Sequence, residues 1–260
     1  MRAEMGESRS TRSIYDDQAD LWTRRDKCLL SDFTARPRVL EVLQPLQGAH
    51  VLDLGCGEGY VARLAAAEGA SSVFGVDISE KMIESARAAA PAAENCSMEF
   101  AVGDAATGLC TPREQYDRIV AVFLFNYLDR SQMTDVLRHA RQRLAPGGRF
   151  VFTVPHPCFP YMRDPAQPFF FETQGENYFS AVDRTLEGEI WSIEGDRANV
   201  RCVHKTVADY FQAIRAAGWS AIPGVEELSV TSDHLKASPS FFEPLAGLPL
   251  HMLFTLEEGQ

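Results

Sequence analysis

The chain has 260 residues with a formal net charge of −11 at neutral pH; 45% of the residues are hydrophobic and 23% are charged. These proportions are typical of a globular protein with a full core. No segment approaches the roughly 20 apolar residues that a membrane span needs. Lys and Arg are scattered, whereas nucleic-acid binders usually carry a basic patch. We therefore expect neither nucleic acid nor a membrane as a partner.

The beginning of the chain and the cysteines bear on where the protein works. Residues 1–12 are polar and contain no apolar stretch of the kind found in secretory signals, so we expect an unstructured tail there. The six cysteines include no C-x-x-C pair and none at zinc-finger spacing from a histidine. We expect reduced thiols in a cytoplasmic protein, as a monomer or a homodimer.

Strand-like and helix-like segments alternate from Ala49 to Val154. The expected strands are His50–Leu54, Ser72–Val76, Met98–Val102, Arg118–Leu124 and Arg149–Val154, and the expected helices are Tyr60–Ala67, a segment capped by Ser79, and Ser131–Leu144. Such alternation predicts a parallel sheet with helices on both faces. Because ligands bind at the carboxyl ends of such strands, Asp77, Asp104 and Asn126 are predicted to share one functional edge.

The rhythm breaks between Pro155 and Lys205, where aromatic residues and prolines accumulate. This segment is interpreted as an insertion that ends in a hairpin of Glu189–Ile193 with Asn199–Val203. A helix over Thr206–Ala217 and two last strands near Ala221–Leu228 and Leu250–Leu256 follow. We expect a single domain, 1–260, made of N-terminal cap helices (13–48), a core (49–155), a lid (156–204) and a C-terminal part (205–260).

The strongest motif is the segment 51–59, VLDLGCGEG, in which a strand runs into a glycine turn and then a helix. Glycines allow positive φ and close approach of the backbone to a ligand. A dinucleotide site of the G-x-G-x-x-G type would need its third glycine where Tyr60 stands, and a bulky side chain there would block the approach of the helix to a pyrophosphate.

The segment resembles the first motif of class I S-adenosylmethionine (SAM)-dependent methyltransferases, in the small-molecule branch of the family. Further motifs match in the same order. They are Gly75-Val76-Asp77-Ile78-Ser79, Gly103-Asp104-Ala105, Tyr116 to Ala121, and Leu144 to Arg149. The resemblance implies an α/β, Rossmann-like, seven-stranded, mostly parallel sheet with helices on both faces and an aromatic-rich lid after the fifth strand.

The resemblance also implies which residues contact SAM. Gly55 and Gly57 would line its methionine part, with Asp53 near the amino group. Asp77 would accept hydrogen bonds from the ribose hydroxyls, which suits a carboxylate, and Asp104 would accept one from the adenine amine. The remaining expected contacts are Tyr15, Ile78, Met82, Ala105, Val122 and Phe123.

The implied reaction is an in-line methyl transfer to an N, O or C atom of a small, aromatic or heteroaromatic metabolite, compatible with a role in secondary metabolism. Positioning and exclusion of water supply much of such catalysis, and a base assists when the nucleophile is protonated. The expected catalytic residues are His156, His204 and Tyr127, and the expected acceptor contacts are Asn126, Phe159 and Tyr178.

The end of the fourth expected strand, Val122-Phe123-Leu124, offers no acidic ligand, so we expect no metal. His50, His139, His234 and His251 are interpreted as surface or packing residues. An RNA or protein acceptor, and a SAM-binding module without catalysis, remain as alternatives.

Overall fold

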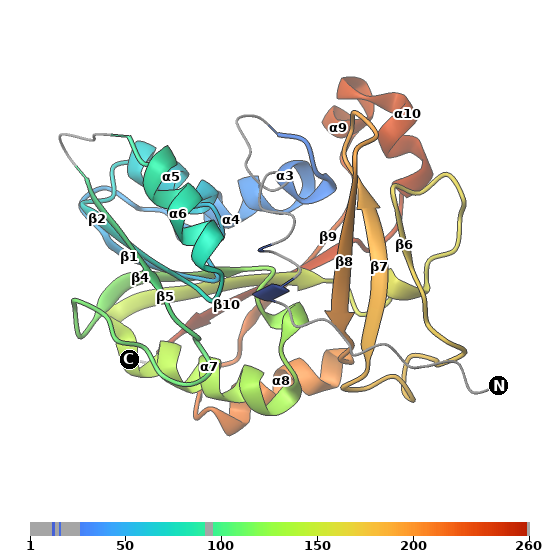
Figure 1. Ribbon diagram of the computed structural model, residues 1–260. Coiled ribbons are helices and arrows are strands. Elements are labelled where there is room, and N and C mark those ends of the chain that lie inside the picture. The colour runs from blue at the N-terminus through green and yellow to red at the C-terminus, as the bar shows by residue number, and fades with distance from the viewer. Residues whose placement is uncertain (1–11, 14–15, 17–26, 92–95, 259–260) are drawn as a thin grey trace.

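The computed structural model describes residues 12, 13, 16, 27–91 and 96–258. Its centre is a seven-stranded sheet in the order β3-β2-β1-β4-β5-β10-β9 (Figure 1). The strands are β1 (His50–Leu54), β2 (Ser72–Asp77), β3 (Ser97–Val102), β4 (Tyr116–Val122), β5 (Leu144–Pro155), β9 (Gly224–Leu228) and β10 (His251–Glu257). β1 to β5 pair in parallel, and β10 runs antiparallel to both of its neighbours.

Helices cover both faces of this sheet, as Figure 1 shows. On one face, α4 (Arg36–Leu43), α5 (Tyr60–Ala67) and α6 (Glu80–Ala89) bury their apolar sides in one cluster with β1 and β2. On the other face, α7 (Arg130–Arg143) and α8 (Val207–Ala216) do the same against β4, β5 and β10. The predicted fold class is therefore confirmed.

Local sequence explains where these helices begin. The Ser79 hydroxyl accepts a hydrogen bond from the backbone N–H of Met82 and caps α6. The Asp129 and Thr206 side chains each form a capping box at the start of α7 and α8. α7 and α8 therefore begin where these side chains satisfy backbone N–H groups of the first helical turn.

A second, three-stranded antiparallel sheet stands beyond the carboxyl ends of the central strands. It consists of β6 (Phe169–Phe171), β7 (Thr185–Trp191) and β8 (Arg197–Val203). Its apolar side packs in a third cluster with Phe159 of the one-turn segment η2 (Phe159–Tyr161), with Phe242 of α10 (Pro239–Phe242), and with Leu30 of α3 (Leu30–Thr34). We call β6, β7 and β8 the lid sheet.

The hairpin of the lid sheet differs from the sequence prediction in register. Glu189 pairs with Asn199, and the strands extend back to a pair between Thr185 and Val203. The turn closes earlier than expected because the Ser192 hydroxyl accepts hydrogen bonds from the backbone N–H groups of Glu194 and Asp196. β6 and α9 (Ser232–Ala237) were not predicted at all.

Within the described part of the chain, no helix has the length and apolarity to span a membrane.

Candidate active site

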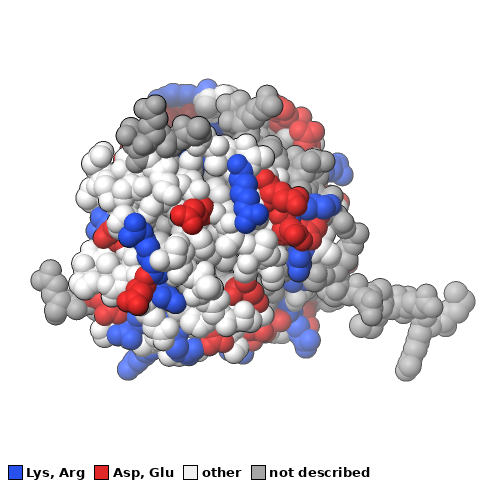
Figure 2. Space-filling model, turned by 60° about the vertical axis from the view of Figure 1, so that its left-hand side comes forward, with Lys and Arg blue, Asp and Glu red and all other residues white. Residues whose placement is uncertain are grey.

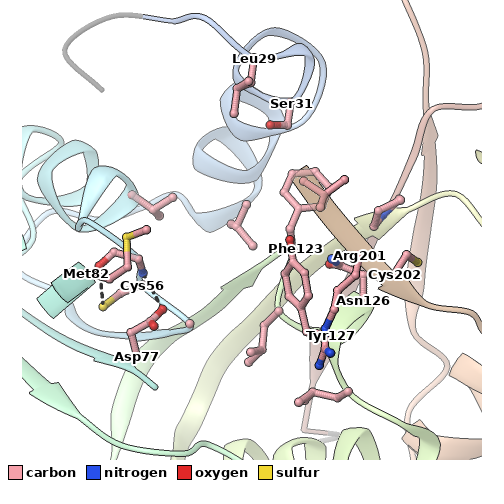
Figure 3. A pocket seen from close by; sticks show the side chains of 18 of the residues that line it. Leu29, Ser31, Cys56, Asp77, Met82, Phe123, Asn126, Tyr127, Arg201 and Cys202 are labelled. Atoms are coloured by element: carbon pink, nitrogen blue, oxygen red, sulfur yellow. Dashed lines mark hydrogen bonds between the residues drawn. The ribbon is translucent and has the colours of Figure 1, made fainter. Parts of the chain in front are cut away.

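A cavity of about 370 Å³ lies between the carboxyl ends of the central strands and the lid sheet. Figure 3 shows its two sides: Cys56, Asp77 and Met82 stand opposite Phe123, Asn126 and Tyr127, and Leu29 and Ser31 of the α3 region lie above them. The volume falls within the range of small-molecule sites. One end of the cavity is acidic and the other is aromatic.

The glycine turn after β1 exposes backbone to the cavity. Gly55 and Gly57 adopt left-handed φ values of 70° and 54°, which favour glycine. The backbone N–H groups of Gly55 and Cys56 donate to the Val76 carbonyl oxygen, and that of Gly57 donates to Asp77 Oδ2 at 2.9 Å. A Cβ added at Gly57 would meet no protein atom within 4 Å. The space beside Gly57 is therefore open to a ligand.

The acidic end contains two buried carboxyl groups, Asp53 and Asp77. Asp53 is 2% exposed, and its Oδ2 has no hydrogen-bond partner among the described residues. Burial, followed by the charge of Asp77, raises the pKa of Asp53 to about 7. Burial also raises the pKa of Asp77, although backbone N–H groups of Ser79 and Gly57 counteract it. An orphaned buried carboxylate is costly unless a ligand completes it.

This end fits SAM in the donors and acceptors that it offers. Asp53 can receive an amino group, and Asp77 retains lone pairs for two hydroxyl groups. Asp104, whose Oδ1 accepts from the Ala106 N–H, lines the cavity together with Ala105. The other predicted cofactor contacts that line it are Gly55, Gly57, Ile78, Met82, Val122 and Phe123. Tyr15 lies outside the described residues.

Arg36 also lines the cavity, although it was not predicted from the sequence. Its Nη1 donates to Asp32 Oδ1 at 2.7 Å, and its guanidinium lies 5.5 Å from the centre of the Phe123 ring. Phe123 itself has a φ of 57°, a strained conformation for a non-glycine residue that is more common at functional sites. Arg36 places a positive charge beside the acidic end, where it could bind the cofactor carboxylate. No local motif marks it, because its role depends on the packing of α4 against β4.

The aromatic end is built by η2 and the lid sheet. Phe159 stacks on Phe169 with ring centres 3.8 Å apart, and Phe171, Ile190 and Trp191 complete the wall. Polar groups face it from the 3-10 helix η1 (Phe125–Tyr127) after β4: Asn126 is 4% exposed with Oδ1 lacking a partner within the described chain, and Tyr127 follows it. Arg201 and Cys202 of β8 lie beside these residues, on the same side of the cavity (Figure 3).

Three predicted residues lie away from the cavity. His156 has both ring nitrogens engaged, with Nε2 2.9 Å from Glu227 Oε1 and Nδ1 accepting from the Cys158 N–H. His204 Nε2 donates to the Tyr178 carbonyl oxygen, and the Tyr178 hydroxyl accepts from the Val207 N–H. None of the three lines the cavity. Their catalytic or acceptor-binding roles stay predictions that this arrangement does not favour.

His251, the first residue of β10, does line the cavity. From the sequence it was interpreted as a surface or packing residue, because it belongs to no recognisable motif. The pairing of β10 with β5 brings it opposite Pro155, at the functional edge. Among the described residues, no cluster of three or more His, Cys, Asp or Glu side chains could hold a metal ion.

Comparisons with known proteins agree with this geometry. A family model described as a methyltransferase domain matches residues 51–148. The trans-aconitate 2-methyltransferase of Streptomyces avermitilis is 37% identical over 133 residues, which cover 48% of this chain and 47% of that protein. A ubiquinone biosynthesis O-methyltransferase of Coxiella burnetii is 24% identical over 76% of this chain and 73% of its own length. The chain spans about half the length of the first curated relatives that it matches.

A solved structure covers more of the chain. The S-adenosylmethionine-dependent methyltransferase of Mesorhizobium loti is 28% identical and superposes with a TM-score of 0.62 over 84% of this chain and 95% of that one. Residues 51–148 thus form a methyltransferase domain, and the chain has the fold of the class I SAM-dependent methyltransferases. SAM is the cofactor of this family, and the acidic end of the cavity fits it.

Proposed function

We propose that the protein transfers the methyl group of SAM to an N, O or C atom of a small, flat, apolar acceptor that lies at the aromatic end of the cavity. The observation that carries the proposal is the continuity of the two ends: the acidic residues around Asp77 and the aromatic wall around Phe159 line the same cavity. When bound, SAM supplies an electrophilic methyl group on a positively charged sulfur.

The contribution of the protein is positioning and exclusion of water. Asp53, Asp77 and Arg36 hold the cofactor at one end, and the lid sheet covers the other, so that the two reactants meet in a largely apolar space. Fixing two reactants in this way replaces an encounter in solution. The curated relatives named above for trans-aconitate and ubiquinone biosynthesis support a small molecule as acceptor.

The surface favours this proposal over an RNA acceptor. In the face that Figure 2 shows, Lys and Arg are scattered among Asp and Glu on a largely uncharged surface, and the described residues form no continuous basic patch there. The net charge of −11 disfavours binding of a negatively charged phosphate backbone. An RNA acceptor would give binding that weakens steeply with salt.

The test is titration with S-adenosylhomocysteine (SAH) in a calorimeter, followed by a methyl-transfer screen of aromatic acceptors. We expect micromolar binding by the wild type and its loss in Asp77→Ala. The matched control is Asp117→Ala, which removes a carboxylate that accepts from the His50 N–H at the opposite edge of the sheet. No binding by the wild type, or equal losses in the two variants, would contradict the proposal.

A further inference from the structure

The His251 side chain occupies a position between the two ends of the cavity. It is 4% exposed, with the Phe123 ring edge-on at 5.0 Å and the Phe159 ring nearly parallel at 6.0 Å, measured between ring centres. Phe123 follows β4 and Phe159 begins the aromatic wall. A group on His251 that faces the cavity therefore meets a ligand where the cofactor and acceptor regions join.

A hydrogen-bond chain determines which nitrogen of His251 carries the proton. The Thr34 hydroxyl donates its single proton to the Leu30 carbonyl oxygen at 2.9 Å. Toward His251 Nδ1, 3.1 Å away, the same hydroxyl oxygen can then only accept. Nδ1 is therefore the protonated nitrogen, and Nε2 bears a lone pair.

No described residue provides a hydrogen-bond donor to Nε2. The hydrogen bond to Thr34 uses Nδ1, and the contacts with the Phe123 and Phe159 rings do not use Nε2. His251 lines the cavity, so a ligand can supply the donor. A nearly buried acceptor of this kind needs a donor from a ligand, since a buried acceptor without a hydrogen bond is unfavourable. The cofactor carboxylate is a poor partner for Nε2, because its lone pairs would face the lone pair of this nitrogen. The Arg36 guanidinium is the better partner for that carboxylate.

The ring also stays uncharged. Burial, with the positive charge of Arg36 and the proximity of His156, lowers the pKa of His251 to about 3. A neutral imidazole of this kind does not keep a proton that it abstracts, but it can hold an N–H or O–H in a fixed direction. Its role is therefore to orient the nucleophile. When the methyl group moves from the sulfur of SAM to the nucleophilic atom, SAH would leave with the electron pair of the broken C–S bond, and the N–H or O–H proton would be released to solvent.

We propose that His251 Nε2 accepts a hydrogen bond from an N–H or O–H group of the methyl acceptor and so positions the nucleophilic atom, which makes the substrate a neutral phenol, heteroaromatic N–H compound or amine on a flat apolar frame. This rests on the proposed function. It excludes acceptors whose reacting atom is a carboxylate or a carbon without a neighbouring N–H or O–H. Phe123 and Phe159, whose rings flank that of His251, would contact the flat frame of such a substrate.

The first experiment tests the tautomer in the protein without any ligand. ¹⁵N NMR of protein labelled at histidine, with His251→Asn to assign the signals, reports which ring nitrogen is protonated. We expect Nδ1–H in the wild type and a tautomer mixture in Thr34→Val, which removes the hydroxyl but keeps its shape. A protonated Nε2 in the wild type would overturn the proposal.

The second experiment uses matched probes on the SAH-bound protein: phenol against anisole, and indole against 1-methylindole. We expect the protic member of each pair to shift the Nε2 signal of His251 and the capped member to leave it in place. His251→Gln, whose side-chain oxygen can accept the same hydrogen bond, should keep part of the preference for protic probes, and His251→Phe should lose it. Equal shifts within each pair, or none from either protic probe, would contradict the proposal.

SAH calorimetry separates this inference from the proposed function. Wild-type protein that fails to bind SAH would remove the function, while the tautomer measurement would stand by itself. SAH affinity in His251→Phe is expected to stay within about threefold of the wild type. A loss of tenfold or more would show that Nε2 serves the cofactor amino group, and would overturn the assignment to the acceptor.

Discussion

Asp53 is kept at the cavity at a cost to the folded protein. Its pKa is raised to about 7 by burial and by Asp77, against about 3.9 in an unfolded chain. Between these two values the folded state binds a proton that the unfolded state has released. Stability therefore falls as the pH rises from about 4 to 7, and the loss is complete above the folded pKa.

Asp53→Asn is expected to remove this penalty. At pH 8 and without cofactor, the free energy of unfolding of the variant should exceed that of the wild type by about 2–4 kcal/mol. The difference should vanish below about pH 4. Thermal unfolding across this pH range measures it, and a variant that is less stable at pH 8 would contradict the account.

The same substitution should alter cofactor binding in the opposite sense. A cofactor ammonium group favours ionised Asp53, so SAH affinity of the wild type should rise as the pH increases toward about 7 and then level off. Asp53→Asn should bind more weakly and show a flatter profile between pH 6 and 8. Calorimetry at several pH values checks this, and a wild-type affinity that falls over the range would count against it.

Gly57 offers a test of the open space beside the turn. An alanine there would carry a Cβ into the cavity, at a φ of 54° that costs a non-glycine residue about 1–2 kcal/mol. We expect at least a tenfold loss of SAH affinity. Gly147→Ala is the matched control, because Gly147 has a φ of 72°, equally open surroundings and a position at the opposite edge of the sheet. It should lose similar stability and no affinity.

Single residues differ in how far the sequence reveals them. The place of Asp53, Asp77 and Asp104 at the cavity could be predicted, because each lies at or just after the carboxyl end of a strand in a recognisable local motif, and these strand ends meet at one edge. Arg36 and His251 could not, since their place depends on how α4 and β10 pack against distant strands. His156 shows the converse case: it follows β5 as expected, but Glu227 of β9 and the Cys158 backbone engage its ring, so its predicted role stays a prediction that this arrangement does not favour.

At the scale of elements, the parallel core was predictable and the lid sheet was only partly so. Buried parallel strands are continuous apolar runs, and helices between them carry caps such as Ser79 and Asp129. β6 has three residues, Phe169–Phe171, which is too short for a periodic signal. Its pairing with β7 arises from tertiary packing on Phe159.

The lid sheet should depend on Phe159 as its anchor. Phe159→Ala removes a buried ring that contacts Phe169 and Phe171, and such truncations cost about 3–5 kcal/mol. We expect faster hydrogen exchange in β6 and β7 with little change in β1 and β2. Phe170→Ala is the control, since Phe170 is 50% exposed on the other side of β6 and should leave exchange unchanged. Equal effects of the two variants would argue against this anchoring role.

For the whole molecule, net charge distinguishes the cofactor from its product. SAM carries a positive sulfonium in addition to its amino acid charges, whereas SAH does not. A protein with a net charge of −11, and with Asp53 and Asp77 lining the cavity, should attract the charged form more strongly. Salt screens this attraction over a Debye length of about 8 Å at physiological ionic strength.

We therefore expect SAM affinity to weaken by severalfold between low salt and about 0.5 M NaCl, while SAH affinity stays nearly constant. Paired titrations of the two ligands at each salt concentration measure the difference, with SAH serving as the control for general salt effects. Identical salt dependence would show that Arg36 and the nearby dipoles offset the acidic residues at the cavity. The expected divergence would mean that loss of the positive charge on methyl transfer weakens the hold on the product and favours its release.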